Sequence, residues 1–266
     1  MKHNTREHLH NILSQNELRR YSRQIIIPYI SKKGQKKIKD ACVLIAGVGG
    51  LGSISAYYLA AAGIGYIRLV DKDFVGEENL NRQIIYWTKD IGKRKVYSAK
   101  KKLQELNPYC TVDAIQGEIM DDTILKFCSD CHIIVDATDN IKTRRVLNRA
   151  SLTLGIPYIF GGVDGFNGMT TTFVPGETPC FECIFSGLSG NKKTIGVIGP
   201  IPGIIASIQA LEAIKLILGM ECTLKGRLFF FSGIDMKIKE IGIEKNLDCP
   251  ACRSSKRAKA YEEKND

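Results

Sequence analysis

Residues 43–52 read Val-Leu-Ile-Ala-Gly-Val-Gly-Gly-Leu-Gly, and this stretch decides the fold. An apolar run suited to a buried strand leads directly into the pattern G-x-G-x-x-G, formed by Gly47, Gly49 and Gly52. The small residues of 53–62 then favour a helix. A strand, turn and helix of this kind brings phosphate oxygens to backbone N–H groups at the positive end of the helix. We therefore predict a nucleotide-binding turn at these glycines.

The segments that follow alternate between strand and helix as far as residue 155. Tyr66–Val70 is apolar enough for a second strand, and Asp71 follows it, placed to accept hydrogen bonds from a ribose hydroxyl. Further strands are expected at 110–115 and 132–135, with helices at 93–106, after Asp121 and after Asn140. Because strands and helices alternate, we predict an α/β fold with a Rossmann-like, doubly wound parallel sheet.

The second half of the chain has a different pattern. Strands are expected at 157–160 and 166–174, a helix at about 204–218, and two more strands at 228–231 and 237–243. Strands without intervening helices predict a mixed or antiparallel extension of the same sheet. We expect a basic helical segment at 1–40, one domain at 41–252 with a nucleotide half at about 41–155 and a second half at about 156–252, and a basic tail at 253–266.

Composition excludes several classes of protein. The 266 residues contain no run of 18 apolar residues, so no membrane span is expected, and the first residues lack the apolar core of an export signal. Nine cysteines in such a chain suggest reduced thiols or metal ligands in a cytoplasmic protein. The net charge of +10 is concentrated in residues 1–40, which suits an acidic partner or a polyphosphate, with nucleic acid as the less favoured alternative.

Polar residues that could surround a nucleotide recur after Asp71. Cationic side chains together with carboxylates and amides around one nucleotide suit a triphosphate with Mg²⁺. The glycine pattern alone would equally permit NAD(P) and hydride transfer. However, His132 is the only histidine after residue 10, so a histidine proton donor is poorly supplied. The candidate nucleotide-site residues are Asp71, Asp73, Asn79, Arg82, Gln83, Lys95, Asp139 and Asn140.

With these motifs the chain resembles the ThiF/MoeB/HesA family, the bacterial relatives of ubiquitin-activating enzymes. Members adenylate the C-terminal glycine carboxylate of a small ubiquitin-like sulfur carrier, using MgATP and releasing pyrophosphate. The resemblance covers about residues 20–252. It rests on the glycine turn, two cysteine pairs, and the motifs Arg20–Gln24, Asn79–Gln83, Ile91–Lys95 and Asp136–Asn140.

The resemblance implies a role for each matching residue. Gly50 would line the phosphate turn, and Asp139 would bind Mg²⁺ beside Asn140. Arg23 would reach into the site of a neighbouring subunit, which implies a homodimer. The remaining contacts to phosphate would come from Asn79, Arg82 and Lys95. Arg23, Arg82, Lys95 and Asp139 are thus the candidate catalytic residues.

Two CxxC pairs, Cys180/Cys183 and Cys249/Cys252, can supply the four thiolates of a closed, structural Zn²⁺ site. The pairs lie far apart in sequence, and the resemblance implies that they meet. Two free reduced pairs or a disulfide remain alternatives. A third pair, Cys128/Cys131, lies where a helix leads into a strand, so we interpret it as structural.

The loop 190–196 contains no cysteine, although many family members carry one there for a covalent link to the carrier. We therefore expect adenylation here, with sulfur loaded through another cysteine or another protein such as a cysteine desulfurase or sulfurtransferase. The primary hypothesis is activation of a carrier ending in Gly-Gly for thiamine or molybdopterin synthesis. The alternatives are activation of a tRNA base or peptide C-terminus, an NAD(P)-dependent oxidoreductase, or a non-catalytic nucleotide-binding scaffold.

Overall fold

A computed structural model of the chain describes residues 13–188, 196–221 and 223–252. The helices of the described part are α1 (Gln15–Arg20), α2 (Ser22–Ile25), α3 (Ser31–Asp40), α4 (Gly50–Ala62), α5 (Lys95–Leu106), α6 (Ile124–Phe127), α7 (Ile141–Leu154), α8 (Phe181–Phe185) and α9 (Pro200–Leu218). Two short 3₁₀ helices, Glu77–Asn79 and Thr88–Asp90, lie between β2 and α5. The strands are β1 (Cys42–Ala46), β2 (Tyr66–Asp71), β3 (Thr111–Gln116), β4 (Ile133–Asp136), β5 (Tyr158–Asp164), β6 (Asn167–Phe173), β7 (Arg227–Ser232) and β8 (Lys237–Gly242).

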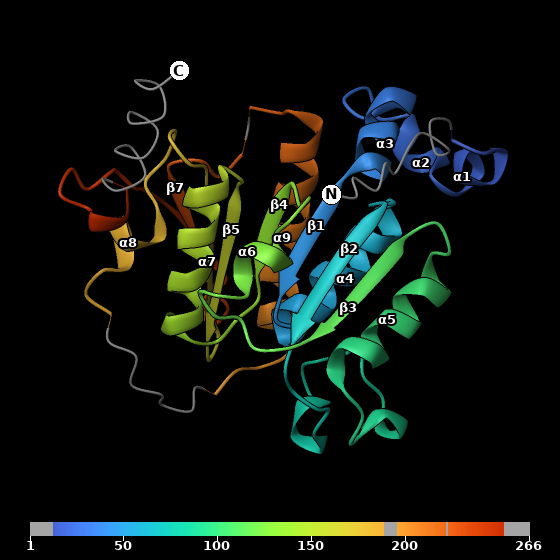
Figure 1. The fold of residues 1–266 in the computed structure, drawn as a ribbon, viewed down its shortest axis with the longest axis horizontal. Coiled ribbons are helices and arrows are strands. Elements are labelled where there is room, and N and C mark those ends of the chain that lie inside the picture. The colour runs from blue at the N-terminus through green and yellow to red at the C-terminus, as the bar shows by residue number, and fades with distance from the viewer. Residues whose placement is uncertain (1–12, 189–195, 222, 253–266) are drawn as a thin grey trace.

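All eight strands form one sheet in the order β3-β2-β1-β4-β5-β6-β7-β8 (Figure 1). The strands β1 to β5 pair in parallel, whereas β5 to β8 pair antiparallel. The predicted Rossmann-like sheet with an antiparallel continuation is therefore confirmed. The chain runs outward from β1 to β3 and then returns to place β4 on the other side of β1. Such a switch in strand order opens a crevice at the carboxyl ends of β1 and β4, where open α/β sheets bind their ligands.

Helices cover both faces of the sheet, as expected for a doubly wound fold. Alternate residues of β1 point to opposite faces: Val43 and Ile45 join a core that includes residues of α3, α4, α5 and α9. Leu44 and Ala46 join a second core with α6 and α7, which lie in front of the sheet in Figure 1. This burial on both sides explains why β1 is a continuous apolar run rather than an alternating one.

The helix α9 begins four residues earlier than predicted. Pro200 and Pro202 occupy its first turn, where backbone N–H groups have no acceptor within the helix, so both prolines are tolerated there. The helix is long and apolar enough to meet the length and composition criterion for a membrane span. Its apolar residues pack against α4 and the sheet, for example Ala206, Ala210 and Ala213, so packing within the protein accounts for its composition.

The described part of the basic N-terminal segment is helical, as predicted, and packs against the end of the sheet from which β1 starts. Ser14 caps α1, and its side chain accepts a hydrogen bond from the backbone N–H of Glu17. Asn107 donates a hydrogen bond to the hydroxyl of Tyr21 at 2.8 Å. Gln24 donates to the backbone carbonyl of Ala62 at 3.0 Å. The contact of Gln24 attaches α2 to the last turn of α4, and that of Tyr21 attaches the start of α2 to the end of α5.

Candidate functional site

The glycine turn after β1 is tightly packed. Gly47 has φ of +88°, a conformation that favours glycine. A Cβ atom on Gly52 would lie 2.0 Å from the carbonyl oxygen of Gly47, so only glycine fits there. Gly49 is the N-cap of α4, and Gly50 is its first residue. The turn therefore directs the backbone N–H groups of the first turn of α4 toward the crevice, an arrangement suited to phosphate.

Asp71 at the end of β2 stabilises this turn. One of its carboxylate oxygens accepts a hydrogen bond from the backbone N–H of Val48 at 2.7 Å. The other accepts from the backbone N–H of Asp73 at 2.8 Å. A carboxylate offers about four acceptor positions, so Asp71 can still accept a bond from a ribose hydroxyl. The structure thus adds a structural role to the one predicted.

Lys95 is joined to the same turn through Asp73. The ammonium nitrogen of Lys95 lies 3.4 Å from a carboxylate oxygen of Asp73, and the backbone N–H of Lys95 donates to the carbonyl of Asp73. Lys95 is only 6% exposed, whereas Asp73 is exposed. A largely buried cation next to an exposed carboxylate can exchange that partner for a phosphate when a nucleotide binds.

The long connection between β2 and α5 carries Asn79, Arg82 and Gln83. The side-chain oxygen of Asn79 accepts from the backbone N–H of Gly76, so this buried residue shapes the loop. Arg82 donates to the carbonyl of Glu78 at 2.8 Å. Gln83 is buried, and its side-chain oxygen has no hydrogen-bond partner in the described part of the chain.

The Asp136–Asn140 motif follows β4 and lies beside the glycine turn, since a Cβ atom on Gly47 would be 2.8 Å from the carbonyl oxygen of Ala137. Asn140 is the N-cap of α7 and accepts from the backbone N–H of Thr143. The capping position therefore belongs to Asn140 and leaves the exposed Asp139 available for a cation. Carboxylate and amide oxygens are the ligands that Mg²⁺ prefers, so this loop fits that ion.

Arg23 is the predicted catalytic residue that the structure does not bring to this site. It lies on α2, which is attached to the C-terminal end of α4, whereas the glycine turn precedes the N-terminal end. The 13 residues of α4 separate the two by about 20 Å at 1.5 Å per residue. The side chain of Arg23 is exposed.

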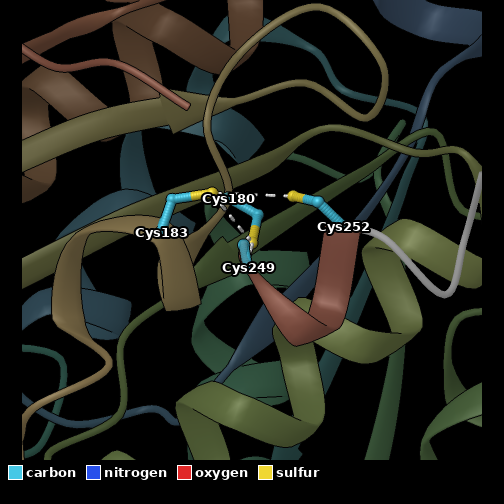
Figure 2. A group of neighbouring side chains, drawn as sticks. All are labelled: Cys180, Cys183, Cys249 and Cys252. Atoms are coloured by element: carbon cyan, nitrogen blue, oxygen red, sulfur yellow. Dashed lines mark hydrogen bonds between the residues drawn. The ribbon is translucent and has the colours of Figure 1, made fainter. Parts of the chain in front are cut away.

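Four cysteine side chains converge at a second location, beside α7 and α8 (Figure 2). The sulfur of Cys180 lies 3.8 Å from that of Cys183 and 3.7 Å from that of Cys249. The sulfurs of Cys183 and Cys252 are 3.6 Å apart. Thiolates at 2.3 Å from a tetrahedral ion are separated by about 3.8 Å, so this cluster can hold such an ion. The structure thus brings together the two CxxC pairs predicted to meet.

Burial disfavours the thiolate form at two of the four cysteines: it raises the pKa of Cys180, and it raises the pKa of Cys252 to about 11. At Cys183 burial also acts to raise the pKa, but hydrogen bonds to the sulfur outweigh it and lower the pKa. A bound divalent cation reverses the preference at Cys180 and Cys252 because it stabilises deprotonated ligands. The side-chain amide of Asn148 also lies 3.7 Å from the sulfur of Cys180, where it can donate to a thiolate.

The third cysteine pair lies elsewhere. Cys128 and Cys131 are buried in the core around α6, and the sulfur of Cys131 lies 3.5 Å from that of Cys42. Within the described residues, the four cysteines of Figure 2 are the only group of three or more histidine, cysteine, aspartate or glutamate side chains that could together hold a metal ion. The loop 190–196, whose lack of a cysteine led us to expect sulfur loading through another cysteine or another protein, falls almost entirely outside the described residues.

Sequence reasoning missed the roles of three buried or partly buried residues, one in the Asp136–Asn140 motif and two beside it. Asp136 was quoted only as part of the motif, although its carboxylate is fully buried. Tyr158 donates to it at 2.6 Å, and Arg144 lies beside it. A buried carboxylate at the end of a strand was the available signal for Asp136, whereas no local pattern marks Tyr158.

Comparison with known proteins agrees with this geometry. The model of the ThiF family matches residues 21–251. A sulfur carrier protein adenylyltransferase of Thermus thermophilus is 36% identical over 246 residues, which cover 89% of this chain and 91% of that protein. The sulfur carrier protein ThiS adenylyltransferase of Escherichia coli is 36% identical over 247 residues, covering 91% and 98%. A crystal structure of E. coli MccB with MccA-N7isoASN has a TM-score of 0.80 and 27% identity, covering 88% of this chain and 74% of that one.

Proposed function

The chain belongs to the ThiF family, and we propose that it uses ATP to activate the C-terminal glycine carboxylate of a small ubiquitin-like sulfur-carrier protein. Its relatives are adenylyltransferases, and it is an enzyme of that class. The observation that carries the proposal is the meeting of the glycine turn and the Asp136–Asn140 loop at the switch in strand order. We propose that the product serves thiamine or molybdopterin synthesis in the cytoplasm.

The proposed reaction needs little acid–base chemistry. A C-terminal carboxylate has a pKa of about 3.3–3.7, so it is already an anionic nucleophile at neutral pH. It attacks the α-phosphorus of ATP, an acyl–phosphate bond forms, and the bond to pyrophosphate breaks. The protein must therefore position the reactants and neutralise negative charge. We assign charge neutralisation to Lys95 and Arg82, and positioning of the phosphates to the turn formed by Gly47, Gly49, Gly50 and Gly52.

Asp139, with Asn140 beside it, is proposed to hold Mg²⁺ together with the phosphates of ATP. When bound, this ion neutralises charge on the phosphates. We propose that Asp71 contacts the ribose and that Asp73 lies close to it. We propose that Asn79 and Gln83 also contact the nucleotide, from the connection between β2 and α5. The buried side-chain oxygen of Gln83, which has no hydrogen-bond partner among the residues that the structure describes, supports a polar ligand near that residue.

ATP–pyrophosphate exchange tests the proposed function. We expect exchange only when ATP, Mg²⁺ and a small carrier protein ending in Gly-Gly are all present. The matched control is the same carrier without its last glycine, which keeps the carrier fold and moves the carboxylate out of reach. Exchange that ignores every such carrier, or that requires a tRNA or an unrelated peptide, would contradict the proposal. NAD(P)-dependent turnover of any substrate would contradict it as well.

Exposed apolar side chains at one edge of the sheet support a protein substrate. Within the described sheet β8 is the last strand, and Ile238 and Ile241 on it are 61% and 48% exposed. Ile234 and Met236, in the turn before it, are 77% and 72% exposed. Ile238 and Ile241 lie on opposite faces of β8, so the edge exposes apolar side chains on both sides, and exposed apolar groups at an uncovered sheet edge are typical of protein interaction sites. We propose that the carrier docks here.

We also propose that the enzyme is a homodimer in which each site receives Arg23 from the other subunit. Within one subunit the length of α4 keeps Arg23 away from the glycine turn. The residues after Arg23 are unusually apolar for a surface, since Ile26 is 70% and Tyr29 is 76% exposed. Ile84, next to the site residue Gln83, is 57% exposed. A two-fold axis that pairs these two surfaces buries both and delivers Arg23.

A mixed dimer tests the exchange of Arg23. We expect Arg23→Ala and Asp139→Ala to be nearly inactive separately. A refolded equal mixture should recover about one quarter of the wild-type exchange activity, because half of the dimers are mixed and each has one intact site. A mixture that stays at the level of its parents, with mixed dimers verified by two affinity tags, would show that Arg23 does not act across the interface.

The metal in the cysteine cluster is proposed to be Zn²⁺, since four thiolates in a closed tetrahedral cluster are typical of structural zinc. No substrate position is open in such a site, so we assign it no step in the reaction. We further propose that sulfur reaches the activated carrier through a separate protein, such as a cysteine desulfurase or a sulfurtransferase. Trapping a thiol-sensitive thioester between this enzyme and the carrier would contradict that division of work.

A further inference from the structure

Asp136 and Arg144 hold Thr138, the residue immediately before Asp139, and Tyr158 in turn holds Asp136. Asp136 accepts hydrogen bonds from the backbone N–H of Thr138 at 2.8 Å and from its hydroxyl at 2.7 Å. Arg144 donates to the carbonyl of Thr138 at 2.8 Å. Tyr158 donates to the second carboxylate oxygen of Asp136 at 2.6 Å. We refer to Asp136, Arg144 and Tyr158 together as the Thr138 clamp.

The clamp is built from groups that are costly to bury singly. Asp136 is 0% exposed, and its charge is balanced by the guanidinium of Arg144, whose Nε lies 3.4 Å from it. Tyr158 is also fully buried, and burial, together with the nearby charge of Asp136, raises the pKa of its hydroxyl. The hydroxyl therefore remains a donor at any pH the enzyme meets. Arg144 additionally donates to the carbonyl of Gly161 and lies against the ring of Phe160.

The clamp leaves Asp139 between two fixed neighbours. On its N-terminal side Thr138 is held at its N–H, hydroxyl and carbonyl groups. On its C-terminal side Asn140 is held as the N-cap of α7. The side chain of Asp139 is nonetheless exposed. The Asp139 carboxylate is thus exposed to solvent while its backbone is held in place. Such a carboxylate is pre-organised for Mg²⁺, which demands near-ideal octahedral geometry.

We propose that Asp136 and Tyr158 are positioning residues that hold the Asp139 carboxylate for the Mg²⁺ bound with ATP, and that Arg144 completes this clamp. The inference rests on the proposed function for the identity of the nucleotide. The new element is that a buried tyrosine on the neighbouring strand β5 fixes the position of the Asp139 carboxylate. We expect that neither Asp136 on β4 nor Tyr158 on β5 touches the substrate.

The effect of Mg²⁺ on ATP affinity tests this inference without requiring catalysis. The dissociation constant of ATP is measured by calorimetry with MgCl₂ and again with EDTA, in the absence of any carrier. The ratio of the two constants reports the coupling between ion and nucleotide. For Tyr158→Phe we expect this ratio to fall roughly tenfold, the value of one hydrogen bond to a charged group, with ATP affinity in EDTA nearly unchanged.

Two further variants distinguish a specific effect on the clamp from a general loss of stability. Thr138→Val keeps the shape of a half-buried loop residue and removes only the hydroxyl contact to Asp136, so it tests the clamp even if Tyr158→Phe fails to fold. Tyr86→Phe is the matched control, since it also removes a buried tyrosine hydroxyl, one that donates to the carbonyl of Val48 in the glycine turn. It should weaken ATP binding equally with and without Mg²⁺.

Combination with Asp139→Asn completes the test. If the clamp acts through Asp139, the double variant Asp139→Asn with Tyr158→Phe should show no further loss of coupling beyond Asp139→Asn alone. Additive losses, equal weakening in MgCl₂ and EDTA, or a wild-type protein that binds ATP equally in both would overturn the inference. Intact coupling with no carrier-dependent exchange would instead contradict the proposed function and leave the clamp standing.

Discussion

Asp139→Ala is expected to reduce ATP–pyrophosphate exchange by about 1,000-fold or more, because it removes the one exposed carboxylate of the Asp136–Asn140 loop that is not used to cap a helix or hold a backbone. The triphosphate would then carry its charge without the ion that offsets it. The side chain is exposed and makes no packing contact in the sheet. The thermal midpoint and the metal content of the cysteine cluster should therefore stay close to the wild-type values. Exchange assays with saturating carrier measure the loss.

The control for this prediction is a second exposed carboxylate at the opposite end of the parallel strands, before β1 rather than after β4. Asp40 ends α3 just before β1 and forms an ion pair with Lys36, so Asp40→Ala removes a charge of the same sign at a distance from the glycine turn. It should retain full exchange activity. If Asp139→Ala also retained activity, the ion would have to be held by other groups, and the assignment of Asp139 would be wrong.

The sequence was sufficient for the strands of the sheet and for the glycine turn because both are encoded locally. An apolar run of the length of β1 followed by G-x-G-x-x-G has few alternative structures, and the observed strands begin and end within a few residues of the predicted ones. The helix α8 was missed because its five residues are too short for a helical period to appear. Its position is set by Cys180 and by packing of Phe181, which are tertiary effects.

The site was predicted less completely than the fold. Residues next to the glycine turn in sequence, or in motifs with charged members, could be found by inspection. Tyr158 could not, because it is one apolar-looking residue in a buried strand, and its hydrogen bond to Asp136 depends on β4 and β5 being neighbours. The second role of Asp71, holding the backbone of Val48, likewise depends on the pairing of β1 with β2.

Replacing Cys249 by serine is expected to release the bound metal and to lower the thermal midpoint of the protein. Cys249 is 1% exposed and, with Cys252, lies beside Cys180 and Cys183, from which it is separated by more than 60 residues of sequence, so a metal held by all four would cross-link the two segments. A cross-link that closes a loop of this length is worth roughly 4 kcal/mol in the chain-entropy model, which in a protein of this size corresponds to about 10 °C. Elemental analysis should fall from one metal ion per chain to less than one tenth.

Cys128→Ser separates loss of the metal from the cost of burying a serine hydroxyl. Cys128 is 2% exposed and belongs to a CxxC pair, yet its sulfur lies outside the four-cysteine cluster. It should keep its metal, and its thermal midpoint should fall by less than that of Cys249→Ser. Equal losses in the two variants would mean that the cluster adds nothing beyond ordinary core packing. A midpoint that falls when dithiothreitol is added, with no metal in the wild-type protein, would instead indicate a disulfide, because a reductant breaks that bond and leaves a zinc–thiolate site intact.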